Sequence, residues 1–213
     1  MGMLRASTVP VVLREPELAT GFPDIVAAYP AAYDASIVRP ALSVDHLRLL
    51  HLLWMNRGAT TLAAAQTLLR LSPIAMRRIT DELHEQRVIV LRGTTLRADK
   101  SAPTFAASRI VAIEAKISKW EDALSQASGN AWFASHSYVL LPSRRIGQRA
   151  LPHARALGIG VLVVDGSAVV TLARARRRPI PVSLGSWIVN EWMINELGRG
   201  KSDRSRGSTN RVS

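Results

Sequence analysis

The spacing of hydrophobic and polar residues separates strand-like from helix-like segments along the chain. Two apolar runs rich in β-branched residues, 8–18 and 22–29, lie on either side of Gly21 and predict a β-hairpin. Prolines and polar residues then form a linker. From Ser43 onward the apolar residues recur at helical spacing. The pattern therefore changes from strand to helix within the first quarter of the chain.

Three short helices and a second β-hairpin are predicted over residues 43–99. Ser43 can cap the first helix and Gly58 ends it, and Ser72 followed by Pro73 is a strong start for the third helix. Three helices followed by a hairpin are typical of a winged helix. A small helical insertion that only packs against the core would show the same pattern.

The rest of the chain alternates between strands and helices. This order favours a layered α/β core, and the short, nearly continuous apolar strands are those expected of parallel strands covered on both faces. The first helix of this part is expected to begin with a capping box formed by Ser118 and Glu121. The predicted elements are strands at 108–117, 136–142 and 160–166, an edge strand at 168–175, and helices at 118–133, 146–157 and 186–197.

The charge balance indicates a polyanionic partner. The 213 residues include 28 Lys and Arg against 16 Asp and Glu, a formal net charge of +12, and such an excess is typical of nucleic-acid-binding proteins. Cysteine is absent, which excludes disulfides and thiolate metal sites. No apolar run has membrane-spanning length, and no glycine motif is placed to bind a nucleotide. We expect a cytoplasmic protein that binds double-stranded DNA, without a membrane or a nucleotide cofactor.

Charged residues interrupt two of the apolar strands. Glu114 and Lys116 are two residues apart in one strand, so they project from the same face, and Asp24 lies in an earlier strand. Such groups are costly to bury unless they are paired or bind a metal. Asp24 and Glu114 offer hard oxygen ligands for Mg²⁺ or Mn²⁺, and Lys116 can orient an attacking water or stabilise developing charge. The alternative is a structural ion pair at the end of a strand.

Pro23-Asp24 followed by Glu114-Ala115-Lys116 resembles the PD-(D/E)XK nuclease superfamily, whose acid–x–lysine motif lies on a central strand. The resemblance covers residues 9–29 and 109–166 and implies a restriction-endonuclease-like mixed sheet flanked by helices. It implies a metal site at Asp24, Glu114 and Ala115, with Lys116 assisting catalysis. The two acids are 90 residues apart, which is long for this superfamily, and the inserted helical segment would explain the length.

Two further candidates follow from the same resemblance. Glu15 or Glu17 could supply the additional upstream acid that many members have, with Glu15 included in the candidate site. Gln126 resembles the helix glutamine of the RecB-like and resolvase-like branches, although the tyrosine that accompanies it there is absent. The substrate preferences of those branches therefore do not carry over.

The expected organisation is a nuclease-like core at 9–39 and 107–197, a winged-helix-like DNA-binding insertion at 43–99, and a disordered basic tail at 198–213. Arginines on the third helix, around the wing and after the edge strand are expected to contact DNA. The function these features indicate is a magnesium-dependent endonuclease. The alternatives are a non-catalytic DNA-binding transcriptional regulator and a toxin- or antitoxin-like interaction protein. A homodimer is possible because most enzymes that cut both strands act as dimers. The candidate DNA contacts are Arg77, Arg78, Arg92, Arg97, Arg176, Arg177 and Arg178.

Overall fold

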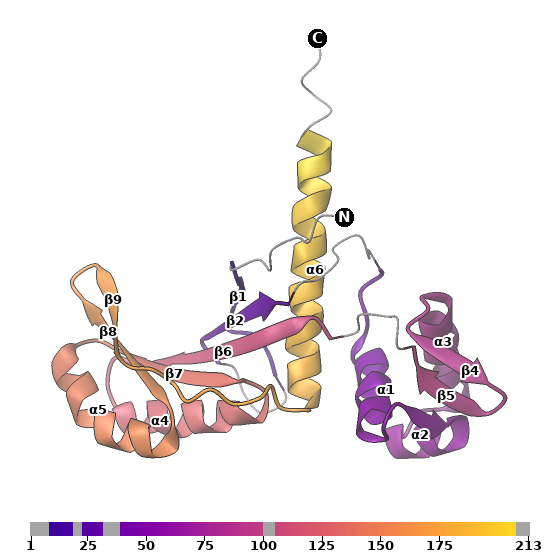
Figure 1. Cartoon of the computed structure of the whole chain (residues 1–213), viewed down its shortest axis with the longest axis horizontal. Helices are drawn as coiled ribbons and strands as arrows, with labels where there is room; N and C mark the ends of the chain where they lie inside the picture. The colour runs from indigo at the N-terminus through magenta and orange to yellow at the C-terminus, as the bar shows by residue number, and fades with distance from the viewer. Residues whose placement is uncertain (1–8, 19–22, 32–38, 100–104, 208–213) are drawn as a thin grey trace, which may run out of the picture. The chain divides into compact units, whose positions relative to one another are not determined.

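The structure, a computed structural model, describes residues 9–18, 23–31, 39–99 and 105–207, with side chains up to residue 199 (Figure 1). The described chain divides into two compact units. The first unit contains the chain up to residue 32 and residues 107–189, and the second contains residues 33–106 and the chain from residue 190 onward. The long segment between the first two strands and the rest of the sheet thus lies outside the first unit.

A six-stranded mixed sheet forms the centre of the first unit. The strand order is β1-β2-β6-β7-β8-β9, in which β6, β7 and β8 are parallel and the other neighbours are antiparallel. The predicted α/β class, with a mixed sheet flanked by helices, is confirmed, as is the edge strand at the end of the sheet. The strands are β1 (Val11–Arg14), β2 (Ile25–Pro30), β6 (Ala107–Ala115), β7 (His136–Leu141), β8 (Gly160–Asp165) and β9 (Ala168–Ala173).

Helices α4 (Trp120–Gly129) and α5 (Arg144–Leu157) connect the parallel strands and lie on the same side of the sheet (Figure 1). This placement is the one that right-handed crossovers produce. A short 3₁₀ turn, η1 (Asn130–Trp132), follows α4. The core between helices and sheet is fully buried and made of small and aliphatic side chains, which include Ala123, Ala127, Val139, Ala150, Ala154, Val161 and Val163.

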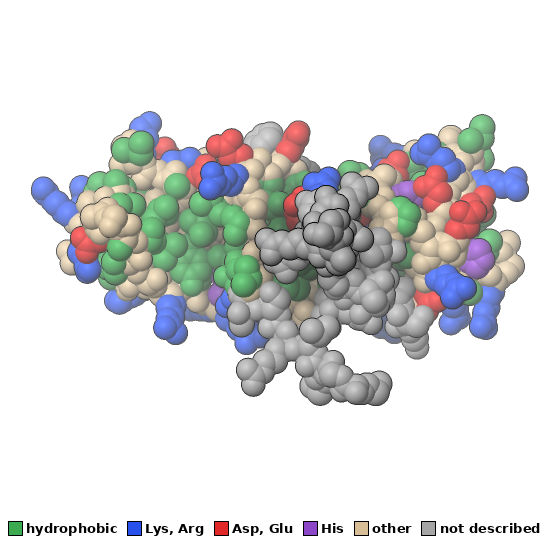
Figure 2. Space-filling model, turned by 90° about the horizontal axis from the view of Figure 1, so that it is seen from above, with side chains coloured by type: hydrophobic (Ala, Val, Ile, Leu, Met, Phe, Trp, Pro, Cys, Tyr) green, Lys and Arg blue, Asp and Glu red, His purple; other side chains and the backbone are tan. Residues whose placement is uncertain are grey.

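The opposite face of the sheet carries half-buried apolar side chains. In β6, buried residues alternate with the half-buried Val111 and Ile113, and in β7 with the half-buried Tyr138 and Leu140. Seen from that side, hydrophobic side chains gather over the first unit (Figure 2). The alternation is the two-residue period expected of strands with two different faces.

The start of α4 differs from the expected capping box. Lys119, with φ 53°, is the N-cap residue, and no side chain caps the helix. The N–H of Asp122 donates to the Lys119 carbonyl at 3.1 Å, so the N-cap lies one residue later than the predicted Ser118. Glu121 and Asp122 instead place negative charge in the first turn, where the helix dipole favours it.

Between residues 39 and 99, the second unit contains three helices and a three-stranded sheet. Ser43 caps the first helix through the N–H of His46, and Ser72 caps the third through the N–H of Ala75, as the sequence predicts. A short strand before the second helix, absent from the sequence prediction, pairs with β5 to give the strand order β3-β5-β4. The elements are α1 (Val44–Met55), β3 (Ala59–Thr61), α2 (Leu62–Leu69), α3 (Pro73–Glu85), β4 (Ile89–Arg92) and β5 (Thr95–Ala98).

The last helix, α6 (Leu184–Gly207), is longer than predicted. The sequence pattern predicts an end at residue 197 and a disordered tail from 198, whereas the helix continues to Gly207. Residues 208–213 lie outside the described part. Arg199 forms a salt bridge one turn back with Glu196 at 2.6 Å, which supports the helix at the point where it was expected to stop. Across the described part of the chain, α6 included, no helix combines the length and apolar character needed to span a membrane.

Candidate acidic site at the ends of β2 and β6

Strand pairing brings the two acids of the sequence motif together. Ile25 of β2 pairs with Ile113 of β6 in antiparallel register, so Asp24 precedes β2 beside Glu114 of β6. The Asp24 Oδ2 accepts a hydrogen bond of 2.6 Å from the backbone N–H of Ala115. Residues 90 apart in sequence thus meet at one end of the strands.

Glu114 is almost completely buried, with 4% of its surface exposed. Its Oε1 accepts a hydrogen bond of 2.7 Å from the side-chain amide of Asn130, at the end of α4. Burial raises the pKa of Glu114 above its usual value; the Asn130 hydrogen bond lowers it, the Asp24 charge raises it and the Lys116 charge lowers it. Both Asp24 and Lys116 are therefore close enough to act on this carboxyl group.

Lys116 lies one residue beyond the end of β6. Its backbone N–H donates to the Leu140 carbonyl of β7 at 3.1 Å, which holds this part of the chain against the sheet. The side chain is half-buried on the same end of the sheet as Glu114. We call Asp24, Glu114 and Lys116, with the supporting Asn130, the acidic site.

The acidic site has ligands that suit a hard divalent cation. The two hydrogen bonds occupy Oδ2 of Asp24 and Oε1 of Glu114, so each carboxyl group has a second oxygen outside these bonds. Among the described residues, no group of three or more Asp, Glu or His is placed to hold a metal. Magnesium is commonly bound by one or two carboxylates with water completing the octahedron, so two carboxylates fit it.

The other candidates for this site lie farther from its centre. The N–H of Glu15 donates to the Asp24 carbonyl at 3.0 Å, so the backbone of Glu15, which has φ 46°, borders the site. The Glu15 and Glu17 side chains are exposed. Gln126 is exposed on α4, whose buried face consists of Ala123, Leu124 and Ala127, and no contact joins it to Glu114.

Asn130, which does contact Glu114, is not among the residues predicted from the sequence. It lies four residues after Gln126, one turn farther along the same helical segment. Its position in the sequence could have identified it. An amide side chain in an otherwise apolar stretch is expected to be hydrogen-bonded if it is buried.

In the second unit, the candidate DNA contacts on α3 and the hairpin are exposed. Arg77 and Arg78 form only long ion pairs along α3, with Asp81 at 3.8 Å and Glu82 at 3.9 Å. Such exposed pairs contribute little to stability and leave both guanidinium groups accessible. The side chains of Arg92, at the end of β4, and Arg97, on β5, are exposed as well.

The three candidate arginines of the first unit follow β9. This segment crosses the amino ends of the parallel strands: the N–H of Arg176 donates to the Gly158 carbonyl at 2.9 Å, and the N–H of Arg178 to the Ser135 carbonyl at 3.0 Å. The pKa of His136 is lowered by burial and by the nearby Arg109 and Arg177. Positive charge thus gathers at the strand ends opposite to the acidic site.

No protein-family model and no curated protein sequence matches the chain. Among solved structures, the chain is similar to the SPO1766 protein of unknown function from Silicibacter pomeroyi, with 14% sequence identity and a TM-score of 0.32. The similarity covers 64% of this chain and 91% of that protein.

Proposed function

We propose that the protein is a metal-dependent endonuclease that hydrolyses phosphodiester bonds in double-stranded DNA. The observation that carries the proposal is the hydrogen bond from the Ala115 N–H to Asp24, which fixes the upstream acid on the residue between Glu114 and Lys116. An acid, a second acid and a lysine then share one end of a mixed sheet. This is the arrangement that the resemblance to the PD-(D/E)XK superfamily implies for its catalytic motif.

The second unit supports the DNA-binding part of the proposal. Its order α1-β3-α2-α3-β4-β5, with a three-stranded sheet, is the order of a winged helix, in which the third helix enters the major groove. The exposed face of α3 presents Ile74, Arg77 and Arg78. In this proposal α3 is the recognition helix and the β4–β5 hairpin is the wing, whose Arg92 and Arg97 contact the phosphate backbone.

Each residue of the acidic site has a distinct role in the proposed reaction. Asp24 and Glu114, with the Ala115 carbonyl, would hold Mg²⁺ or Mn²⁺, which polarises the phosphodiester and lowers the pKa of water. Asn130 orients Glu114 by its hydrogen bond, and the Ala115 N–H does the same for Asp24. Lys116 directs its ammonium charge toward the attacking water or the developing phosphorane charge.

The test is nicking of supercoiled plasmid in the presence of Mg²⁺ or Mn²⁺. Asp24→Asn and Lys116→Ala should each reduce nicking by about a hundredfold or more, since both groups act on the transition state. Asp165→Asn and Arg149→Ala change the same charges at exposed positions of the first unit and should cut at the wild-type rate. Wild-type nicking in both acidic-site variants would refute the proposed site.

A second function, a DNA-binding regulator that uses the nuclease-like core as a scaffold, is favoured by one observation. Only two acids meet in the described part of the acidic site, and one of them is buried with a raised pKa. Salt-sensitive duplex binding that is equal in wild type, Asp24→Asn and Lys116→Ala, without nicking of any plasmid, would establish this function.

A further inference from the structure

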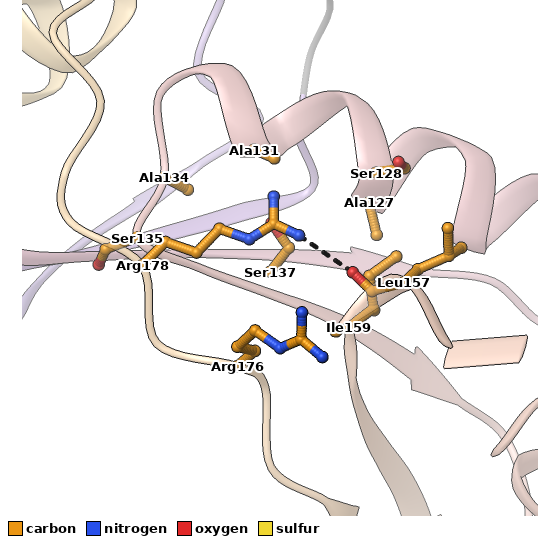
Figure 3. A pocket seen from close by; sticks show the side chains of 11 residues that line it. Ala127, Ser128, Ala131, Ala134, Ser135, Ser137, Leu157, Ile159, Arg176 and Arg178 are labelled. Atoms are coloured by element: carbon orange, nitrogen blue, oxygen red, sulfur yellow. Dashed lines mark hydrogen bonds between the residues drawn. The ribbon is translucent and has the colours of Figure 1, made fainter. Parts of the chain in front are cut away.

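A small pocket lies at the amino ends of β7 and β8, between these strands and the carboxyl ends of α4 and α5 (Figure 3). It is partly open to solvent, and its volume is about 20 Å³, room for about one water molecule or one oxygen of a larger group. We call it the arginine pocket, because two guanidinium groups enter it. It is lined by Ala127, Ser128, Ala131, Ala134, Ser135, Ser137, Leu157, Gly158, Ile159, Arg176 and Arg178.

The first of these groups, Arg178, has a structural partner. Its Nη2 donates to the carbonyl of Leu157, the last residue of α5, at 3.1 Å (Figure 3). A cation at this place complements the negative end of the helix dipole. One guanidinium group of the pocket is thus held in position without the need of a ligand.

Arg176 is held by its backbone and by a glycine. Its N–H donates to the Gly158 carbonyl, and a Cβ on Gly158 would lie 3.1 Å from the Cβ of Arg176. Gly158 also has φ 74°, a conformation that favours glycine. The close approach therefore depends on this residue, and it directs the Arg176 side chain into the pocket beside Arg178 (Figure 3).

No acidic side chain among the described residues pairs with the arginines of the pocket. Its lining contains two arginines and no Asp or Glu, and neither Arg176 nor Arg178 forms a salt bridge with any described acid. Both side chains are exposed, so water screens the repulsion between them and their positive charge stays accessible to an anion. Arg177 and Arg109, whose charges act on the nearby His136, add to the positive potential at this end of the sheet.

Hydroxyl groups complete the lining. Ser135 is used by the fold, since its Oγ accepts from the Ile110 N–H at 3.1 Å and donates to the Ile110 carbonyl at 2.9 Å. Ser137 is buried on the helix-covered face of β7, where an apolar residue is expected, and Ser128 lies on α4. Guanidinium and hydroxyl donors around a small space are the groups that proteins use to bind phosphate oxygens.

We infer that the arginine pocket binds a phosphate group of a nucleic-acid strand, at a place separate from the acidic site. The inference that the phosphate belongs to a nucleic acid rests on the proposed function. The pocket admits phosphate oxygens but excludes a base or a sugar, because of its volume. Arg176 and Arg178 bind the oxygens, and the adjoining Arg177 extends the contact along the strand.

The test of the site uses the full chain without metal or duplex DNA. Binding of inorganic phosphate is measured by calorimetry and by thermal unfolding, against sodium chloride of the same ionic strength. Phosphate should bind wild type and raise its unfolding temperature, and Arg176→Ala should weaken phosphate affinity by about tenfold or more. Arg174→Ala removes an exposed charge outside the lining and should bind phosphate as wild type does. Equal affinities in wild type and Arg176→Ala would overturn the site.

The source of the phosphate is tested with short single-stranded oligonucleotides that carry either a 5′-phosphate or a 5′-hydroxyl. If a strand end is bound, the phosphorylated form binds more tightly and loses this advantage in Arg176→Ala. If an internal phosphodiester is bound, Arg176→Ala weakens both forms equally. If Arg176→Ala affects inorganic phosphate but neither oligonucleotide, the nucleic-acid source is wrong. These outcomes do not depend on nicking, so a failure of the proposed nuclease activity remains a separate result.

Discussion

The carboxylate of Asp24 is fixed on the backbone of Ala115, with 2.6 Å between Oδ2 and the amide nitrogen. The bond joins the residue before β2 to the last residue of β6, and it places the upstream acid beside Glu114 through protein contacts alone. The geometry of the acidic site is therefore set by the fold before any ligand binds, which is the preorganisation that efficient sites require.

Two replacements of Asp24 should show how much its hydrogen bond to Ala115 stabilises the fold. Asp24→Ala leaves the Ala115 N–H without its acceptor and should lower the free energy of unfolding by about 1–3 kcal/mol. Asp24→Asn keeps an oxygen acceptor and should lose less than about 1 kcal/mol. Urea denaturation of both variants measures the difference, and an equal loss in both would show that the hydrogen bond does not stabilise the fold.

The stability of the protein should depend on pH through Glu114. Because burial raises the pKa of Glu114 in the folded state, the folded protein holds this proton more tightly than the unfolded chain. This contribution is complete below the usual value of 4.5 and is lost as pH rises through the folded pKa. Glu114→Gln keeps an acceptor for Asn130 but has no proton to lose in this range. The unfolding temperature of Glu114→Gln should therefore increase relative to that of wild type as pH rises from 4 to 8.

Magnesium provides the control for this pH dependence. At the proposed site Mg²⁺ would bind the deprotonated carboxylate, so Mg²⁺ should raise the unfolding temperature of wild type more at pH 8 than at pH 5. Glu114→Gln should respond weakly at both pH values. A magnesium response that is the same in wild type and Glu114→Gln would place the ion elsewhere.

A buried ion pair in the second unit should be critical for its stability. Nη1 of Arg39 donates to Oε1 of Glu191 at 2.8 Å, a second bond joins Nη2 to Oε2, and the Leu42 N–H donates to the same Oε1. The two side chains are 8% and 3% exposed. Glu191→Ala leaves a buried charge without its partner and should cost about 3–5 kcal/mol.

The comparison for this pair is the double variant Arg39→Met/Glu191→Leu. It replaces both charges by apolar groups, and it should be less destabilised than Glu191→Ala alone. Denaturant unfolding of the three proteins measures this. Should the double variant lose more stability than the single one, the charge of Arg39 is not the source of the cost.

Ile74 offers a test of base recognition by α3. This side chain is 84% exposed near the start of the helix, one turn before Arg77 and Arg78. If α3 enters the major groove, Ile74 is placed to contact the methyl group of a thymine. In a duplex selected from random sequences, replacement of that thymine by uracil should weaken wild-type binding by about fourfold, the value of one buried methyl group.

The matched variant is Ile74→Ala, which should bind the thymine and uracil duplexes equally. Fluorescence anisotropy at constant salt measures the four affinities, because phosphate contacts change with salt concentration. An identical preference for thymine in wild type and Ile74→Ala would assign methyl recognition to another residue.

The sequence was informative where local signals and tertiary packing agree. Ser43 and Ser72 cap their helices as expected, and the alternation around Glu114 matches the buried face of β6. Short strands without an apolar pattern, such as Ala59–Thr61, depend on a partner strand and could not be predicted. Asn130 was missed for a similar reason, since its role appears only when α4 packs over β6.

The pairing of Pro30 with Ala107 has a consequence for how such chains can change. The chain leaves the sheet at Pro30 and re-enters it at the neighbouring Ala107. The pairing of β2 with β6 therefore does not depend on the number of residues between these two positions. Insertions or deletions there would alter the spacing of Asp24 and Glu114 in sequence while their separation in space stays constant. The position of the two acids in space therefore follows from strand pairing and not from the length of chain between them.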